Sequence, residues 1–444
     1  MSWQRQLPSD KAIDVMLMIV DHFEPVRLES SGLDAEIPGA GVAHWCERFQ
    51  NNVGRYRDSD GRPPQYSWFF AADYPDFASL QTLSDYAFRG MGEVEFHLHH
   101  GFDTHASFSR KLHDGLDWFN RAGAMMTSEH QPQQRFAYIA GDWSLDNGCR
   151  DDSTSGCNTE LIALRDAGCY ADFTFPALGS VAQPRKTNAI YYATDCPAPK
   201  SYDGGADVAV GCPASGDLMM FQGPLVIDWR RGRFDDGSLE NSTPPAAHRL
   251  ANWLSAHVHV VGRPEWVFIK LFTHGIQNHE VMLGPSLRAA VEAMASQWKQ
   301  PPLRLHFVTA REAYNIVKAA EAGEQGNPND YRDYAIPRPA NRQIRCSRAW
   351  RLRAFAKNRI SMEILQPGLV EIDFAEPFPV ASLRGEFRNL EITIPENEPR
   401  PAQIRCDGPF EMKYREAGDP RCRWAVARSA GADWVEEHLV KAAQ

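Results

Sequence analysis

Three histidines lie close together at the end of an apolar segment. His97, His99 and His100 follow residues 94–96 directly. Imidazole nitrogen binds zinc and other divalent ions, so this cluster predicts a metal site. On an extended strand His97 and His99 point to one face and His100 to the other, whereas a bend at Gly101 would pair His97 with His100. The sequence leaves both pairings open.

Other ionisable residues also follow apolar segments. Asp21 and His22 come directly after residues 15–20, and His274 lies at the end of the apolar segment 266–272. Asp21 could be a general base or a metal ligand, and the competing interpretation is a helix cap or an Asx turn. His274 could be a general acid or a turn residue. The candidate ligands of one divalent ion, with Zn²⁺ as the first expectation, are His22, His97, His99 and His100.

Aromatic and acidic residues near further segment ends are candidates for substrate binding. Flat aromatic rings can stack on sugars, and each of these rings could equally pack in the core. Arg185 and Lys200 could meet an anionic group or could be ordinary solvated surface residues. The candidate substrate-binding residues are Asp142, Trp143, Tyr191, Tyr192, Asp228 and Trp229.

Short apolar segments alternate with segments of helical length, which indicates parallel βα units. The predicted strands are 15–20, 66–70, 94–98, 135–140, 171–175, 224–227, 267–272 and 303–308. The predicted helices are 41–56, 77–89, 105–125, 158–167, 246–257 and 286–298, and Thr309 with Glu312 has the spacing of a capping box that begins another. Eight strands are enough to close a barrel. Because the carboxyl ends of parallel strands lie at one face, the candidate residues are expected to meet there.

A different pattern follows this α/β domain, which we place at residues 1–326. Residues 327–341 are rich in proline and polar residues and are expected to form a linker. Residues 342–444 predict a small antiparallel β domain with strands at 360–364, 369–374, 390–394, 403–406 and 410–414, ending in a helix at 433–442. This domain could bind carbohydrate, cover a barrel edge or mediate formation of a homo-oligomer.

Composition excludes several classes of protein. The 444 residues carry a formal charge of -10, with 43% apolar and 23% charged residues, as in a folded globular protein. The acidic balance and the lack of a basic stripe argue against nucleic-acid binding and favour a neutral or weakly charged substrate. No apolar segment approaches ~20 residues and no export signal begins the chain, so no membrane association and a cytoplasmic location are expected. The nine cysteines form no CxxC pair and are expected to be free thiols.

The motifs resemble those of the polysaccharide deacetylases of the NodB-homology group, a carbohydrate esterase family. MLMIVDHFEP, EVEFHLHH and IKLFTHG are similar to three of its motifs in order and spacing. The resemblance implies a distorted (β/α) barrel of seven to eight strands. It also implies that Asp21 is the base, that His97 is the first histidine ligand and that His274 is the general acid.

The chain departs from the family pattern at three places. His22 replaces the metal-binding acid, and Gly101 occupies the position of the second histidine ligand, so His99 or His100 must substitute. Asp142 and Trp143, in AGDWSLDNG, replace a motif that bears arginine. The segments HLHH, GCYADFTFP and KLFTHG are closest to an uncharacterised bacterial subgroup.

The resemblance implies a metal-dependent hydrolase that removes an N- or O-acyl group, such as acetyl, from a carbohydrate or glycan precursor. One alternative is a glycosidase on a similar barrel that uses the carboxylates of Asp142 and Asp228 without a metal. Another is a carbohydrate-binding protein whose altered motifs mark an inactive site.

Overall fold

The computed structural model describes residues 7–8, 11–25, 40–74, 76–88, 90–125 and 133–338, together with eight strands between residues 350 and 437. The chain divides into two compact units. The first comprises residues 1–87, 91–126 and 133–339, and the second comprises residues 88–90, 127–132 and 340–444. All the candidate site residues belong to the first unit.

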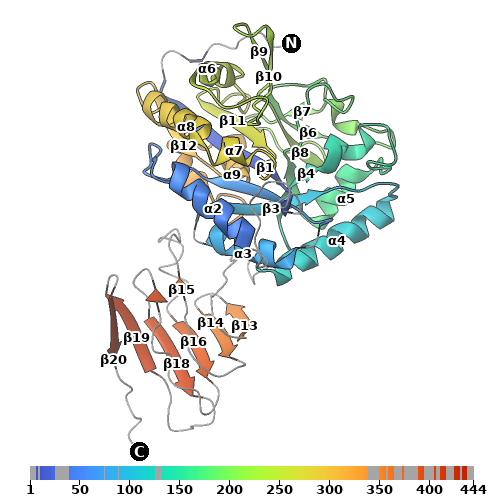
Figure 1. The fold of residues 1–444 in the computed structure, drawn as a ribbon. Helices are drawn as coiled ribbons and strands as arrows, with labels where there is room; N and C mark the ends of the chain where they lie inside the picture. The colour runs from blue at the N-terminus through green and yellow to red at the C-terminus, as the bar shows by residue number, and fades with distance from the viewer. Residues whose placement is uncertain are drawn as a thin grey trace, which may run out of the picture. The chain divides into compact units, whose positions relative to one another are not determined.

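A ten-stranded, mostly parallel sheet forms the centre of the first unit (Figure 1). Its order is β11 (Trp266–Thr273), β1 (Ile13–Phe23), β2 (Tyr66–Ala71), β3 (Gly92–Leu98), β4 (Phe136–Ala140), β5 (Cys169–Asp172), β8 (Leu218–Gln222), β6 (Ala189–Ala193) and β7 (Ala206–Asp207). The tenth strand, β12 (Leu303–Phe307), pairs with β1. The α/β class is therefore confirmed.

The predicted closure into a barrel is wrong, because the sheet stays open. At one end of the sheet, β1 pairs with β11 along one of its edges. The other edge of β1 pairs with β12 at residues 13–17 and with β2 at residues 20–23. At the other end β6 is antiparallel to both β8 and β7. Within the described chain, the links between this end and β11 are isolated bridges such as Ala209 with Val261 and Val258 with Phe268. Single bridges do not continue a parallel ladder, so no closed barrel forms.

Each of the eight predicted strand segments overlaps an observed strand, but the segment 224–227 does not join the large sheet. It gives β9 (Val226–Asp228), which pairs with β10 (Arg233–Asp235) in a separate two-stranded hairpin. Pro224 lacks the N–H that a central strand must donate, which disfavours a place in the large sheet. The structure instead supplies β6 and β8, two strands that we did not predict.

Helices lie along the sheet (Figure 1). They are α2 (Ala40–Val53), α3 (Phe77–Phe88), α4 (His105–Arg121), α5 (Glu160–Ala167), α6 (Ala247–Ser255), α7 (His279–Met282), α8 (Pro285–Gln297) and α9 (Ala310–Glu321). The predicted capping box at α9 is confirmed, since the Thr309 side chain accepts from the Glu312 N–H and the Glu312 carboxylate accepts from the Thr309 N–H. Among the described helices, none has both the length and the apolar character needed to cross a membrane.

Alternation along β1 separates two apolar clusters. Val15, Leu17 and Ile19 pack in the cluster that contains the aromatic rings of α2, whereas Met16 and Met18 pack in the interior cluster. Because successive strand side chains point to opposite faces, residues 22 and 24 continue the interior side and residue 21 continues the helix side. The alternation of side chains therefore allows His22 and Glu24 of the VDHFE segment to reach a site in the interior, and it directs Asp21 away from it.

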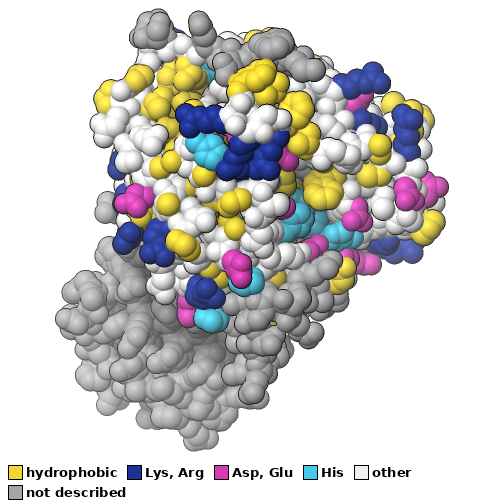
Figure 2. All heavy atoms as spheres, turned by 45° about the horizontal axis from the view of Figure 1, so that its top comes forward, with side chains coloured by type: hydrophobic (Ala, Val, Ile, Leu, Met, Phe, Trp, Pro, Cys, Tyr) yellow, Lys and Arg dark blue, Asp and Glu magenta, His cyan; other side chains and the backbone are white. Residues whose placement is uncertain are grey.

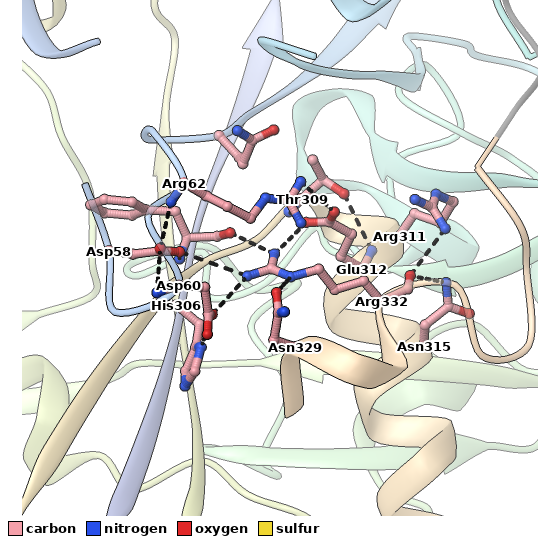
Figure 3. A network of polar contacts seen from close by, with 12 residues as sticks. Asp58, Asp60, Arg62, His306, Thr309, Arg311, Glu312, Asn315, Asn329 and Arg332 are labelled. Carbon is pink, nitrogen blue, oxygen red and sulfur yellow. Dashed lines mark hydrogen bonds and ion pairs between the residues drawn. The ribbon is translucent and has the colours of Figure 1, made fainter. Parts of the chain in front are cut away.

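Residues 327–338 pack on the first unit, where we expected a linker. Arg311 donates hydrogen bonds to the carbonyls of Arg332 and Ile336, at 3.1 and 2.6 Å. The Arg332 guanidinium in turn contacts Glu312 at 2.8 Å and Asn329 at 2.6 Å (Figure 3). These bonds to α9 make the segment part of the α/β unit, which extends to residue 339.

The same network contains a buried histidine. His306, on β12, contacts Asp14 through Nε2 at 2.8 Å and Asp60 through Nδ1 at 2.6 Å. Burial alone would lower the pKa of His306, but the two carboxylates outweigh it and the pKa is raised. The charged ring therefore stabilises this end of the sheet.

The second unit is a β domain, as predicted, but its sheet is mixed and not antiparallel. Its order is β13 (Trp350–Ala356), β14 (Arg359–Ile364), β16 (Asn389–Ile394), β18 (Glu411–Glu416), β19 (Ala425–Ala430) and β20 (Asp433–Glu437), with β15 (Asp373–Phe374) paired to β17 (Arg405–Cys406) apart from it. The pairs of β16 with β14 and with β18 are parallel. The predicted helix 433–442 is wrong over residues 433–437, which form β20, and residues 438–442 lie outside the described chain.

Candidate metal centre

A cavity of about 230 Å³ opens where β1, β3, β4 and β11 end. Its walls are polar, and histidine and acidic side chains lie side by side on the face shown in Figure 2. The lining residues are His22, Glu24, His99, Asp142, Trp143, His274 and Gln277. The carboxyl ends of these strands therefore meet at one site, as expected for a parallel sheet.

Glu24 and His99 of the cavity lining, together with the buried His97, have the geometry of a metal site. One ligand atom from each of Glu24, His97 and His99 lies within 4.8 Å of the other two. The Glu24 Oε1 atom is 3.2 Å from His99 Nε2 and 4.0 Å from His97 Nε2. Two imidazoles and one carboxylate suit Zn²⁺ and several other first-row divalent ions, and they leave a coordination position for water or substrate.

Each of the three candidate ligands is held by a second group. The His97 Nδ1–H donates to the Ile139 carbonyl at 2.8 Å, which turns Nε2 towards the cluster. His99 donates to the Asp73 carboxylate from Nδ1 at 3.1 Å and from its backbone N–H at 3.0 Å. Gln277 donates to Glu24 Oε2. Such outer hydrogen bonds are the usual support of metal-binding histidines and carboxylates.

The electrostatics of the cluster favour a cation. His97 Nε2 is fully buried and has no hydrogen-bond partner among the described residues, and burial lowers the pKa of His97 to about 4. Burial opposes charge on His99 too, but hydrogen bonds to Asp73 and Glu24 raise its pKa to about 10. Despite its burial, Glu24 has a pKa of about 2 because of His99 and His97. The site thus combines a neutral, buried imidazole nitrogen of His97 with the carboxylates of Glu24 and Asp73. A divalent ion bound there would be stabilised by all of these groups.

His274, directly after β11, contributes another histidine to the cavity. His274 lies 2.9 Å from Glu240, which accepts a hydrogen bond from its Nδ1. The His22 ring lies between His274 and His97, with ring centroids 4.5 and 5.1 Å away. Trp143 packs at 5.9 Å from the His274 ring. The cavity therefore joins the candidate ligands to a histidine whose ring orientation is fixed by a carboxylate.

Asp21 lies behind this wall, although we predicted it to be the general base. Its carboxylate is completely buried and accepts hydrogen bonds from the Gly275 N–H and the Tyr66 hydroxyl, both at 2.7 Å. Burial raises its pKa to about 7. Because residue 21 faces the helices, the carboxylate fixes the backbone next to His274 and does not line the cavity.

His100 also points away from the cluster. Its ring contacts Asp103 at 3.0 Å and Glu160 at 3.4 Å. The structure therefore pairs His97 with His99, the alternative in which the strand continues without an early bend. His22 lines the cavity but is not one of the three grouped ligands.

The candidate substrate-binding residues divide into two groups. Asp142 and Trp143 line the cavity. Tyr191 and Tyr192 are buried, and their hydroxyls donate to the Tyr202 carbonyl and to a glutamate of α9. The structure thus places both tyrosines in the packing of the sheet.

Asp228 and Trp229 stand on the β9–β10 hairpin, outside the cavity lining. Asp228 is buried and faces His248 and Arg231 at 3.8 and 3.9 Å, whereas Trp229 is 66% exposed.

Sequence reasoning missed four residues of the site: Glu24, Asp73, Glu240 and Gln277. Strand periodicity could have found Glu24, because it is two residues from His22 and so lies on the same face, just as His99 lies with His97. The other three lie on connecting segments, and the sequence carried no signal that would place them beside the histidines.

A comparison with protein-family models found no match, and a comparison with curated proteins also found none.

Proposed function

We propose that the protein is a metal-dependent hydrolase that removes an N- or O-acyl group from a carbohydrate. The observation that carries this proposal is the cluster of Glu24, His97 and His99 at a cavity that also contains His274. A divalent ion held there would polarise an acyl carbonyl and lower the pKa of a water molecule so that it can attack.

The other cavity residues supply the remaining roles. Two carboxylates line the cavity, Glu24 and Asp142. Because Glu24 is assigned as a metal ligand, we assign to Asp142 the removal of a proton from the attacking water. His274 protonates the leaving amine or alcohol, and Glu240 holds its ring by accepting from Nδ1. Trp143 offers an aromatic face beside His274 for the sugar ring.

The geometry gives less support to the other two functions. A glycosidase would need Asp142 and Asp228 on either side of one bond, but Asp228 is buried outside the cavity against His248. An inactive binding protein would have lost its metal ligands. Here two histidines and a carboxylate with outer hydrogen bonds remain in place.

Elemental analysis of the purified protein tests the metal site. We expect stoichiometric metal in the wild type and loss of that metal in Glu24→Gln and His97→Ala. His113→Ala is the matched control, since His113 lies exposed on α4 and donates only within its own helix. Circular dichroism of each variant separates loss of metal from loss of fold.

Release of acetate from N-acetylated and O-acetylated oligosaccharides tests the reaction. We expect release that stops on chelation, returns with added zinc, and is abolished in His97→Ala but not in His113→Ala. A metal-free wild type that still cleaves a glycosidic bond would contradict the proposal and favour the two-carboxylate mechanism.

A further inference from the structure

The β9–β10 hairpin presents a basic and aromatic surface that the proposed function does not use. Its tip has the sequence WRRGRF, and all six residues are exposed. Trp229 is 66% exposed and Phe234 is 47% exposed. Three arginines in six residues are unusual in a chain whose formal charge is -10. We call residues 229–234 the basic hairpin tip.

The charges of the tip are mostly unneutralised. Among the described residues, no acidic group forms an ion pair with Arg230 or Arg233, while Arg231 is 3.9 Å from Asp228. Other basic candidates differ. Arg185 is 2.9 Å from Asp203, and Lys200 donates to two backbone carbonyls and lies 3.3 Å from the same carboxylate. Of these basic residues, those of the tip combine a neighbouring exposed tryptophan with guanidinium groups that form no ion pair within the described chain.

The base of the hairpin is rigidly anchored. The buried Asp235 carboxylate accepts from Arg249 at 2.6 and 2.9 Å and from the Trp253 indole at 3.0 Å. The buried ion pair fixes β10 against α6, so the tip is presented from a fixed support. A preorganised surface loses little conformational entropy when it binds.

The hairpin also leads directly into the cavity wall. After β10 the chain runs beside the end of β11, where Gly237 and Leu239 exchange backbone hydrogen bonds with Phe272. One residue later Glu240 contacts His274. The segment that follows the hairpin therefore reaches the wall of the cavity. In Figure 2, which turns the top of Figure 1 forward, Lys and Arg side chains gather beside hydrophobic ones on the face that also shows the histidines.

The cavity and the tip differ in the charged groups that they offer. Glu24 and Asp142 line the cavity beside three histidines, and no arginine or lysine is among its lining residues, whereas the tip carries three arginines. The arginines of the tip can attract an anionic sugar unit and bind its carboxylate, sulfate or phosphate with two parallel hydrogen bonds. The net charge of the chain predicted a neutral substrate, and the local distribution of charge changes that expectation.

We infer that the basic hairpin tip binds an anionic sugar unit of an oligosaccharide whose neighbouring, uncharged unit carries the acyl group in the cavity. This inference rests on the proposed function for the identity of the reacting unit. Arg230 and Arg233 bind the anionic group, and Trp229 stacks on the face of the same sugar ring. The substrate class is thus an acidic, partly acylated glycan at least two units long.

Binding of unacylated oligosaccharides tests this inference without any hydrolysis. The titrants are a tetramer of galacturonic acid and a tetramer of glucose, measured calorimetrically with the full chain as purified. We expect the acidic tetramer to bind about tenfold more tightly at low salt, and this preference to shrink at about 0.3 M salt. Arg230→Gln with Arg233→Gln should remove the preference and leave binding of the glucose tetramer unchanged.

Two further variants complete the design. Arg110→Gln with Arg121→Gln, two exposed arginines of α4, removes the same charge and should retain the preference. Trp229→Ala should weaken both tetramers. Equal binding of the two tetramers by the wild type, or a preference that survives the hairpin double variant, would overturn the inference. Tighter, hairpin-dependent binding of phosphatidylserine vesicles or of oligoadenylate would overturn it in favour of a membrane or a nucleic acid.

Failure of this inference and failure of the proposed function give different results. If acetate release is metal-dependent but the acidic tetramer has no advantage, only the hairpin assignment fails. If the acidic tetramer binds through the arginines but no acyl group is released, the proposed hydrolase fails and the binding surface stands.

Discussion

Asp73 offers the sharpest test of the metal site, because it touches a candidate ligand without being one. Its carboxylate accepts from His99 Nδ1 at 3.1 Å and from the His99 backbone N–H at 3.0 Å. In Asp73→Asn the amide oxygen can still accept one of these bonds. The negative charge that holds the ring and makes its Nε2 a stronger donor to a metal is lost.

The expected effect is a weaker metal site in a folded protein. Loss of an outer carboxylate typically lowers metal affinity by about 10- to 100-fold, which corresponds to about 1.4–2.7 kcal/mol. Asp73 also helps to raise the pKa of His99 to about 10, so a proton competes with the metal at this nitrogen. Affinity should therefore rise with pH in the wild type, and this rise should end at a lower pH in Asp73→Asn.

The assay is competition for zinc against a chromogenic chelator at several pH values. Asp76→Asn is the matched control, since Asp76 is three residues away and accepts hydrogen bonds from Ser79, not from a histidine. An unchanged zinc affinity in Asp73→Asn, or an equal loss in Asp76→Asn, would refute the assignment of His99 as a supported ligand.

Three further predictions concern other parts of the first unit. Glu240→Gln should lower kcat about 10- to 100-fold with little change in KM for an acetylated sugar, because His274 loses the partner that orients it. Lys270→Met should destabilise the fold by about 2–4 kcal/mol in urea unfolding, because the buried ammonium donates to the carbonyls of Phe173, Phe175 and Phe221. His306→Gln should flatten the dependence of stability on pH. The raised pKa of His306 adds stability that is complete below the ordinary histidine pKa of about 6.5 and is lost as pH rises through the pKa of the folded state.

Each of these predictions has its own contrary result. A phenyl acetate with an activated leaving group needs little protonation, so Glu240→Gln should spare it. An equal loss on both substrates would exclude a role in orienting the acid. A Lys270→Met protein as stable as the wild type would show that the three carbonyls do not need the ammonium. If the urea midpoint of His306→Gln still falls as pH rises above about 6.5, as in the wild type, another group causes that fall.

The sequence predicted much of the first unit from period and spacing. Its apolar segments located seven strands and the helices between them, and Thr309 with Glu312 located the start of α9. The prediction failed where pairing depends on distant parts of the chain. β6 and β8 were not predicted, because a five-residue segment between turns gives little periodic signal. The segment beginning at Pro224 was expected to be a strand of the sheet, and it forms a hairpin.

The sequence by itself determined which side chains of one strand share a face. Alternation puts Glu24 with His22 and puts Asp21 on the opposite face, since a strand has a period of two. It pairs His97 with His99 where the strand continues, and the sequence left open the bend that would pair His97 with His100 instead. That information was present in the VDHFE and HLHH segments, although we assigned Asp21 to the site on the strength of its type and of a family resemblance.

Only the tertiary structure decided which faces meet. Glu24 approaches His97 and His99 because β2 lies between β1 and β3 in a fixed register. Asp73 and Glu240 reach their histidines from turns whose course depends on the packing of β3 and β11. The segment after the β9–β10 hairpin reaches the cavity wall because Gly237 and Leu239 pair with Phe272. Contacts between residues tens to hundreds of positions apart depend on the whole packed fold, and local propensity carries no record of them.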